Sequence, residues 1–151
     1  MSHDARLAEL NIQLPEALAP VANYVPWQIS GNLLFVSGQI SAGPDGLIRG
    51  KLGDDMNVAG GTLAARHCGL ALLAQARAAL GSLDRIGRLV KLTAFVNSTP
   101  DFTDQPEVVN GCSDLMVEVL GDAGRHARAA VSAPALPRGV AVEIEAIFEI
   151  A

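Results

Sequence analysis

The chain has 151 residues, half of them hydrophobic and 18% charged, which is enough to bury one sizeable core. Its net charge of −5 and the absence of Lys/Arg runs argue against a surface for nucleic acid or an anionic membrane, since both attract clustered cations. No apolar run reaches the roughly 18 residues that a membrane helix needs. The polar start also lacks a signal-peptide pattern, so we expect a cytoplasmic protein made of one domain, 1–151.

Residues 1–22 predict a short helix followed by an extended arm. Ser2 is a suitable N-cap, and Asp4 suits the positive end of a helix over residues 2–10. Pro15 and Pro20 then break regular structure, so we expect residues 11–20 to be extended.

A β-hairpin is predicted next, with strands over 27–30 and 33–37 joined by the turn Gly31-Asn32. Tyr24, the only tyrosine, lies just before it and is either a packing residue or part of a site. Gly38 follows the second strand, and it marks either a bulge or a backbone that lines a pocket.

The rest of the chain alternates between strand and helix patterns. After the turn 43–46 we expect a third short strand over 47–51. Asn57 and Gly81 then delimit a long helix over 58–80. A strand over 89–97, a helix from about 105 to 120 and two final strands follow. The apolar stripe expected on the long helix contains Leu63, Leu70, Ala71 and Ala74, and it is widened by Leu72, Leu73 and Ala79.

These elements predict an α+β fold in which one mixed sheet carries two helices on one face. The other face of the sheet combines Thr, Ser, Ala and Phe, which favours a homo-oligomer packed through it. Cys68 and Cys112 lie in helical, apolar surroundings, so we expect buried free thiols.

The two final strands contain the charged residues that could form a binding site. In the strand over 140–150, apolar residues alternate with Glu143, Glu145 and Glu149. Arg128 lies in the preceding strand among small residues. If the two strands are neighbours, Arg128 and one glutamate could line a site for a small carboxylate, which arginine grips with two hydrogen bonds. The alternative is a cross-strand ion pair worth about 0.2–1 kcal/mol.

Other catalytic and metal motifs are missing from the sequence. It contains no HExxH, CxxC, GxSxG or GxGxxG pattern. The acidic pair Asp54-Asp55 has no third ligand at a metal-site spacing, so no metal is expected. Of the three histidines, His126 shares a strand face with Arg128 and could border a site, whereas His67 reads as an ordinary helix residue.

Three segments together resemble a known family. They are Ser37-Gly38-Gln39, the Ala127-Arg128 strand with Leu136-Pro137-Arg138-Gly139, and Val142-Glu143-Ile144-Glu145-Ala146-Ile147. They resemble the signature of the Rid family, the reactive-intermediate deaminases, also called YjgF-like or endoribonuclease L-PSP-like. The resemblance implies a chorismate-mutase-like fold and a homotrimer with a barrel-like sheet core and three pockets between subunits.

The resemblance also implies roles for named residues, without a cofactor. Arg128 would bind the carboxylate of a 2-imino or enamine acid, and Glu143 would position the water that hydrolyses the C=N bond. Tyr24, Ser37 and Asn110 match further residues that line the family's pocket. Ala130 replaces a cysteine that is frequent in the deaminase branch and keeps a backbone N–H there. Ala129 and the segment 22–26 also depart from the family's pattern, and the longer N-terminal arm and the region 97–121 resemble a distinct subgroup.

Three functions follow from these observations. The first is hydrolytic deamination of small 2-imino or enamine carboxylic acids to 2-keto acids and ammonia. The second is a trimer that captures a small carboxylate metabolite without turnover. The third, ribonuclease or translation inhibitor, conflicts with the acidic charge of the chain.

Overall fold

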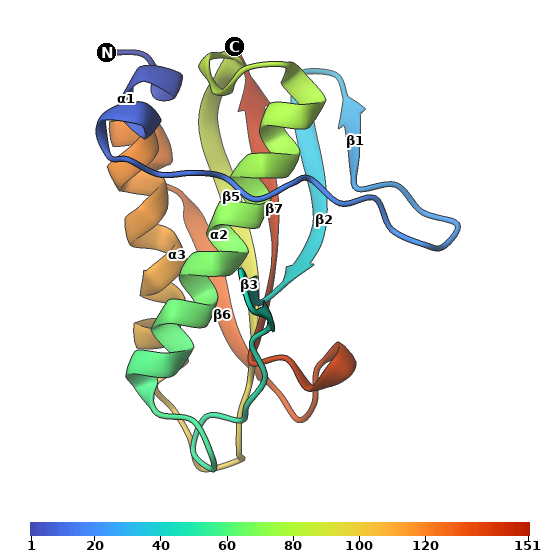
Figure 1. Ribbon diagram of the computed structural model, residues 1–151, viewed down its shortest axis with the longest axis vertical. Helices are drawn as coiled ribbons and strands as arrows, with labels where there is room; N and C mark the ends of the chain where they lie inside the picture. Colours follow the sequence, from blue (N-terminus) through green and yellow to red (C-terminus); the bar gives the residue numbers. More distant parts are fainter.

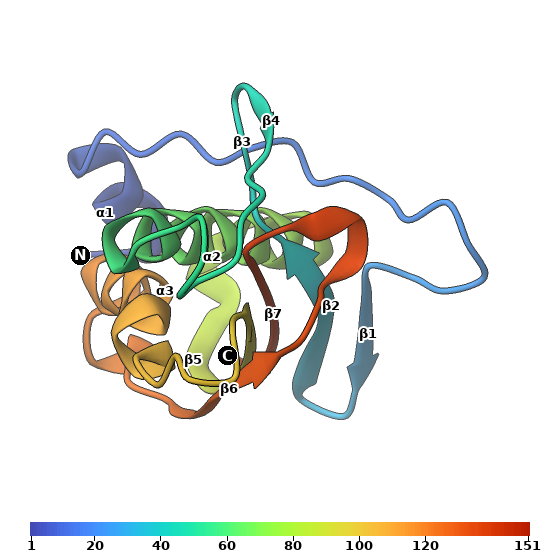
Figure 2. The same ribbon diagram turned by 90° about the horizontal axis from the view of Figure 1, so that it is seen from below.

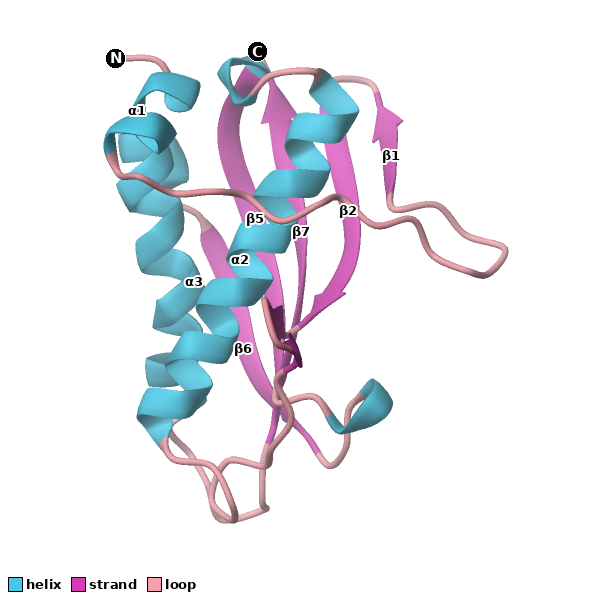
Figure 3. Ribbon diagram, viewed as in Figure 1, coloured by secondary structure: helices cyan, strands magenta, loops and turns pink.

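The computed structural model describes residues 1–151 and contains one five-stranded mixed sheet covered on one face by two long helices (Figures 1 and 3). The strand order is β1-β2-β7-β5-β6, with β6 parallel to β5 and all other pairs antiparallel. The strands are β1 Trp27–Ser30, β2 Leu33–Ile40, β5 Ile86–Asn97, β6 Ala127–Ala133 and β7 Val142–Ile150. The predicted α+β architecture is confirmed.

The hairpin of β1 and β2 forms where the sequence predicts it. Gly31 adopts a φ of 62° in the turn, a conformation that glycine reaches without strain. The return strand runs three residues further than expected, to Ile40. Its register with β7 shifts between Val36 and Gln39, so Ser37 and Gly38 lie at a bulge.

The two long helices, α2 Val58–Leu80 and α3 Gln105–Leu120, have the predicted boundaries. Asn57 caps α2 by accepting a hydrogen bond from the Gly60 N–H, and Gly81 ends it with a φ of 85°. Neither α2 nor any other helix is long and apolar enough to span a membrane.

The buried stripe of α2 agrees only in part with the predicted one. Leu72, Leu73 and Ala74 are buried as expected. Leu63 is 55% exposed instead, and the core also contains residues outside the predicted stripe, namely Ala64, Ala65, Cys68 and Ala76. The prediction gave too much weight to large apolar side chains such as Leu63. The face of α2 toward α3 and the sheet consists largely of small side chains, which let the layers approach each other. As predicted, Cys68 and Cys112 are buried free thiols, and burial raises the pKa of Cys112 to about 12.

Glycines set the closeness of the two helices. A Cβ on Gly111 of α3 would collide with the backbone carbonyl of Thr62 on α2. A Cβ on Gly61 would meet the Val108 side chain at 3.0 Å, so Gly61 serves close packing. The α2–α3 contact thus depends on the absence of side chains at these points.

Short elements complete the chain. Helix α1 spans His3–Glu9 and is capped by Ser2, as predicted. The third strand expected over 47–51 is wrong: the structure has only the small hairpin β3 Ala42–Gly43 and β4 Gly46–Leu47. Beyond it, Arg49 makes a single bridge to Val140, so this segment has no continuous partner strand. Three 3₁₀ turns, Leu83–Arg85, Gly121–Gly124 and Pro137–Gly139, link longer elements.

The extended arm that follows α1 crosses the outer side of α2, so that α2 lies between the arm and the sheet (Figures 1 and 2). Gln75, buried on α2, donates from Nε2 to the carbonyl of Leu18 at 2.8 Å. At the start of the chain, Asp4 N–H donates to Asp84 at 3.0 Å and Arg6 Nε donates to the Glu118 carbonyl at 3.0 Å. The arm is therefore fixed at both ends of its path over α2.

We expect Gly111→Ala to lower the free energy of unfolding by about 1–3 kcal/mol, because the new methyl group must push α2 and α3 apart. Gly60→Ala is the matched control, since its methyl group meets only the side chains of Met56 and Asn57. It should change stability by no more than about 1 kcal/mol. Urea unfolding of both variants measures this, and equal effects would contradict the close packing described above.

Candidate functional site

Arg128 lies on β6, which forms one edge of the sheet, and its guanidinium turns toward α3. Nη1 donates to the Ser113 hydroxyl at 3.2 Å, and Nη2 donates to the Pro106 carbonyl at 3.3 Å. Its cross-strand partner on β5 is Leu92, which is completely buried. Since paired residues share a face, Arg128 belongs to the helix-covered face, at its rim.

His126 completes a hydrogen-bonded chain behind Arg128. Its Nδ1 lies 2.6 Å from the Gly124 carbonyl, and its Nε2 lies 2.8 Å from the Ser113 hydroxyl. A carbonyl only accepts, so Nδ1 carries the proton and Nε2 accepts from Ser113, whose oxygen accepts in turn from Arg128. Burial lowers the pKa of His126, and the nearby positive charge of Arg128 lowers it further. The hydrogen bond to Gly124 acts in the opposite direction and raises it. The histidine is therefore neutral at pH 7.

Two other predicted residues lie on the same side. Asn110 is exposed on α3, four residues after Pro106 and three before Ser113, so it shares their helix face. Ala130 follows Arg128 by two residues on β6 and pairs with the buried Ala94. Arg128, Asn110 and Ala130 thus form one group, which we call the arginine half-site.

Glu143 lies elsewhere, on the face of the sheet that no helix covers. Its partners are Phe95 on β5 and Ile40 on β2. A Cβ on Gly38 would collide with the Glu143 carboxylate, so this glycine is required for the carboxylate to lie against β2. Partial burial raises the pKa of Glu143, and the negative charge of Glu145 raises it further.

Tyr24 and Ser37 accompany Glu143. The Ser37 hydroxyl donates to the Val25 carbonyl at 2.8 Å, and its N–H donates to the Pro26 carbonyl at 2.9 Å, which fixes the loop that carries Tyr24. Tyr24 is 59% exposed and, with Ser37 and Glu145, lines a hollow of about 490 Å³ on the open face. We call Tyr24, Ser37, Gly38 and Glu143 the glutamate half-site.

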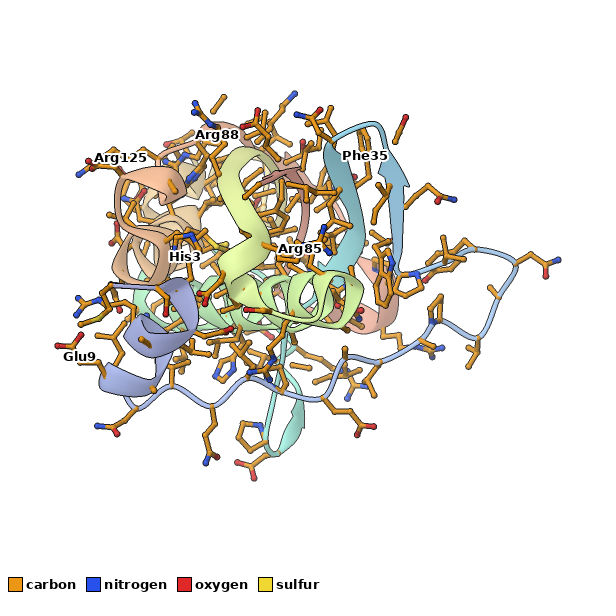
Figure 4. All side chains as sticks on the ribbon, turned by 90° about the horizontal axis from the view of Figure 1, so that it is seen from above. His3, Glu9, Phe35, Arg85, Arg88 and Arg125 are labelled. Atoms are coloured by element: carbon orange, nitrogen blue, oxygen red, sulfur yellow. The ribbon has the colours of Figure 1, made fainter.

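The open face can be followed in Figure 4, where Phe35 on β2 and Arg88 on β5 point away from α2. Phe35 is 40% exposed there, and Val131 on β6 is 44% exposed. Glu143 and Glu145 share this face with them, as the pairing with Phe95 and Thr93 requires.

The two half-sites do not meet within one chain. The sequence alone did not decide whether β6 and β7 are neighbouring strands. In the structure, β5 lies between them. Arg128 pairs with Leu92, whereas Glu143 pairs with Phe95, three residues along the same strand. Residues three apart on a regular strand face opposite ways, so Arg128 and Glu143 lie on opposite faces of the sheet. An ion pair between them in one chain is excluded.

The comparisons with known proteins agree with this architecture. A family model described as "YjgF/chorismate mutase-like, putative endoribonuclease" matches residues 4–148. The chain belongs to this family. Protein TCP17 of Trypanosoma cruzi is 49% identical over 148 residues, which are 97% of this chain and 92% of TCP17.

Two solved structures show how far the likeness extends. Atu1372 from Agrobacterium tumefaciens, a protein of unknown function, is 48% identical with a TM-score of 0.91, over 99% of this chain and 92% of its own. The YjgF gene product of E. coli is 29% identical with a TM-score of 0.63, over 89% of this chain and 93% of its own. The main sheet and its helices are thus those of the YjgF family.

Sequence reasoning missed Ser113 and the carbonyl of Pro106, the two direct partners of Arg128. A signal was present, because both lie at helical spacing from Asn110, which the family resemblance had singled out. What the sequence lacked was the packing of α3 against β6 that brings this helix face to the arginine.

The pKa of Glu143 yields a prediction about stability. Folding raises it above the ordinary 4.5, so the folded protein binds this proton more tightly than the unfolded chain. The ionised carboxylate therefore costs stability above the folded pKa, and this cost disappears as the pH falls below the unfolded value. We expect Glu143→Gln to be more stable than wild type at pH 8, with a gain that vanishes near pH 4.

Thermal unfolding between pH 4 and 8 measures this difference. Asp45→Asn is the control, because Asp45 lies in the exposed turn between β3 and β4. A Glu143→Gln variant that loses stability at pH 8 would contradict the raised pKa.

Proposed function

We propose that the protein hydrolyses small 2-imino or enamine carboxylic acids to 2-keto acids and ammonia. One observation carries the proposal: the chain presents an oriented arginine and, separately, a partly buried glutamate with a raised pKa. An anion-binding group and a general base are the two parts that this hydrolysis needs. Membership of the YjgF family supports the same reaction.

Arg128 is suited to hold the substrate carboxylate. A guanidinium has five N–H donors, and Arg128 uses one on Ser113 and one on Pro106, which leaves three for a ligand. Its two protein partners fix the plane of the group before the substrate arrives. A carboxylate can then accept two parallel hydrogen bonds without first ordering a long side chain.

Glu143 is suited to activate water. Because its pKa is raised, its carboxylate is a stronger base than that of an ordinary glutamate. It takes a proton from water as the oxygen bonds to the imine carbon, and it returns that proton to the nitrogen, which gives a carbinolamine. The carboxylate then takes the hydroxyl proton of the carbinolamine and passes it to the amino group as the C–N bond breaks. Ammonia leaves, and the C=O bond of the keto acid forms.

The complete site on this proposal lies between two copies of the chain. Arg128 of one copy and Glu143 of the next must face each other, because they lie on opposite faces and different strands within one copy. Phe35 and Val131 leave apolar surface on the uncovered sheet face, which favours its burial in an oligomer. A homotrimer, as the family resemblance implies, provides three such sites.

Binding without turnover is the alternative function. Ala129 and Ala130 replace residues that the family resemblance places beside the arginine, so the pocket has fewer polar groups. A binding protein keeps Arg128-dependent affinity for 2-keto acids and releases no ammonia. A nuclease role has less support, because the net charge of −5 opposes binding to a phosphate backbone.

Replacement of the arginine tests the proposed reaction. With imino acids generated in the assay, we expect ammonia release by wild type and a loss of at least about 100-fold in kcat/KM for Arg128→Ala, because a desolvated bidentate carboxylate contact is lost. Arg125→Ala is the control, since Arg125 is exposed and pairs only with Asp122. Release of no ammonia by wild type with any imino acid rejects the reaction.

A mixing experiment tests the shared site. Arg128→Ala and Glu143→Gln subunits, each inactive alone, are unfolded together and refolded as mixed oligomers. If each site takes its arginine and its glutamate from different copies, about a quarter of the sites in a random mixture are intact. We expect about that fraction of wild-type activity. No recovery in verified mixed oligomers would mean that both residues act from one chain.

A further inference from the structure

A cavity larger than the open-face hollow lies next to the glutamate half-site and shares Tyr24, Ser37 and Gly38 with it. Its volume is about 790 Å³, within the range of small-molecule sites. One wall is the face of α2 formed by His67, Leu70 and Ala71. The opposite wall is the extended arm, residues 13–20, and the β3–β4 hairpin closes one end.

This cavity joins the proposed site at one edge. Tyr24 and Ser37 line both the cavity and the open-face hollow that contains Glu145. Gly38, against which the Glu143 carboxylate lies, also lines the cavity. The join exists because β1 ends its pairing at Trp27 and Val36, which leaves the edge of β2 free beyond the bulge. A molecule held beside Glu143 can therefore extend around this edge.

The lining restricts what such an extension can be. It is largely apolar, with Leu14, Leu18, Leu47 and Leu70 among its residues. No Lys or Arg lines it, and its only carboxylate is Glu16 on the arm. A second carboxylate would lose water there without gaining a Lys or Arg partner, since His67 is the one basic side chain of the lining, and it would meet the Glu16 charge. A long apolar chain loses little and gains the burial of its methylene groups.

The arm forms the roof and is held in place independently of any ligand. Gln75 anchors it through Leu18, one turn of α2 beyond Ala71. Leu14 of the arm also packs against the core, whereas Leu18, which lines the cavity, remains 69% exposed. The roof thus presents an apolar residue that the rest of the chain leaves mostly uncovered.

We infer that this cavity is a subsite for the substrate's own side chain, and that the arm selects monocarboxylic 2-imino acids with long apolar side chains. The inference rests on the proposed function, which places the reacting carbon at Glu143. The carboxylate is held by Arg128 of a neighbouring copy, and the side chain passes Tyr24 and lies between the arm and α2. Substrates that end in a second carboxylate are rejected.

Filling the cavity tests the inference. Ala71→Phe places a ring between α2 and the arm, and His67→Phe does so from the preceding turn, in case one variant folds poorly. Ala78→Phe is the matched control, on an exposed position of the same helix outside the cavity. The substrates are 2-iminohexanoate, 2-iminopropanoate and 2-iminopentanedioate, which share the reacting group and differ in side chain.

Wild type should prefer 2-iminohexanoate to 2-iminopropanoate by about tenfold or more in kcat/KM, because three further methylene groups are buried. It should also prefer it to 2-iminopentanedioate. Ala71→Phe should abolish the preference for the long chain and leave 2-iminopropanoate within about twofold of wild type. Ala78→Phe should keep the wild-type pattern. Equal effects of Ala71→Phe on both monocarboxylates, or none on either, overturn the subsite.

If the wild-type protein hydrolyses none of the three substrates, the proposed function is rejected. The subsite is then tested separately, by binding. Calorimetry then compares 2-oxohexanoate with 2-oxopropanoate. Tighter binding of the long acid, lost in Ala71→Phe and kept in Ala78→Phe, supports the subsite without the reaction. Equal affinity for the two acids, or a preference unaffected by Ala71→Phe, overturns it.

Discussion

The pairing of β5 with both β7 and β6 constrains everything else in this molecule. Because paired residues share a face, the alternation along Leu92, Thr93, Ala94 and Phe95 assigns every neighbouring side chain to the helices or to the open face. A slip of one residue would exchange the two sets. The buried side of β5 fixes this register, since Leu92, Ala94 and Val96 have no exposed surface. Arg128 and Glu143 are therefore separated by the same constraint that builds the core.

Strong local patterns explain how much of the fold was predictable. Asn57, Gly81 and the alternation in β7 are signals that act over a few residues, and the structure has these elements where they predict them. The predictions of a buried Leu63 and of a strand over 47–51 failed, because both depend on distant partners. Small side chains decide which face of α2 packs against the core, and Arg49 forms only one bridge, to Val140. For the candidate site, the family resemblance supplied the residue names. Their division over two faces depends on strand order, which no single segment encodes.

The support of Arg128 is notable for its lack of opposite charge. No carboxylate pairs with the guanidinium; a hydroxyl and a backbone carbonyl hold it instead, and a neutral histidine holds the hydroxyl. A carboxylate partner would bind the arginine more strongly, but it would also compete with an anionic ligand for the same charge. Neutral acceptors orient the group and leave its positive charge uncompensated. The protein thus fixes the orientation of the guanidinium, and its positive charge is left for an anionic ligand to neutralise.

The path of the N-terminal arm has a consequence for how such proteins diversify. The arm contributes no strand to the sheet, and it forms no hydrogen bond with Arg128 or Glu143. It lies along the outer side of α2 and accepts a hydrogen bond from the Gln75 amide. Substitutions in residues 13–20 can therefore accumulate without disturbing strand register or the two half-sites. A segment of this kind lets the lining of the cavity drift during evolution while the half-sites stay constant. The chain separates, in space, what selection can vary from what it must keep.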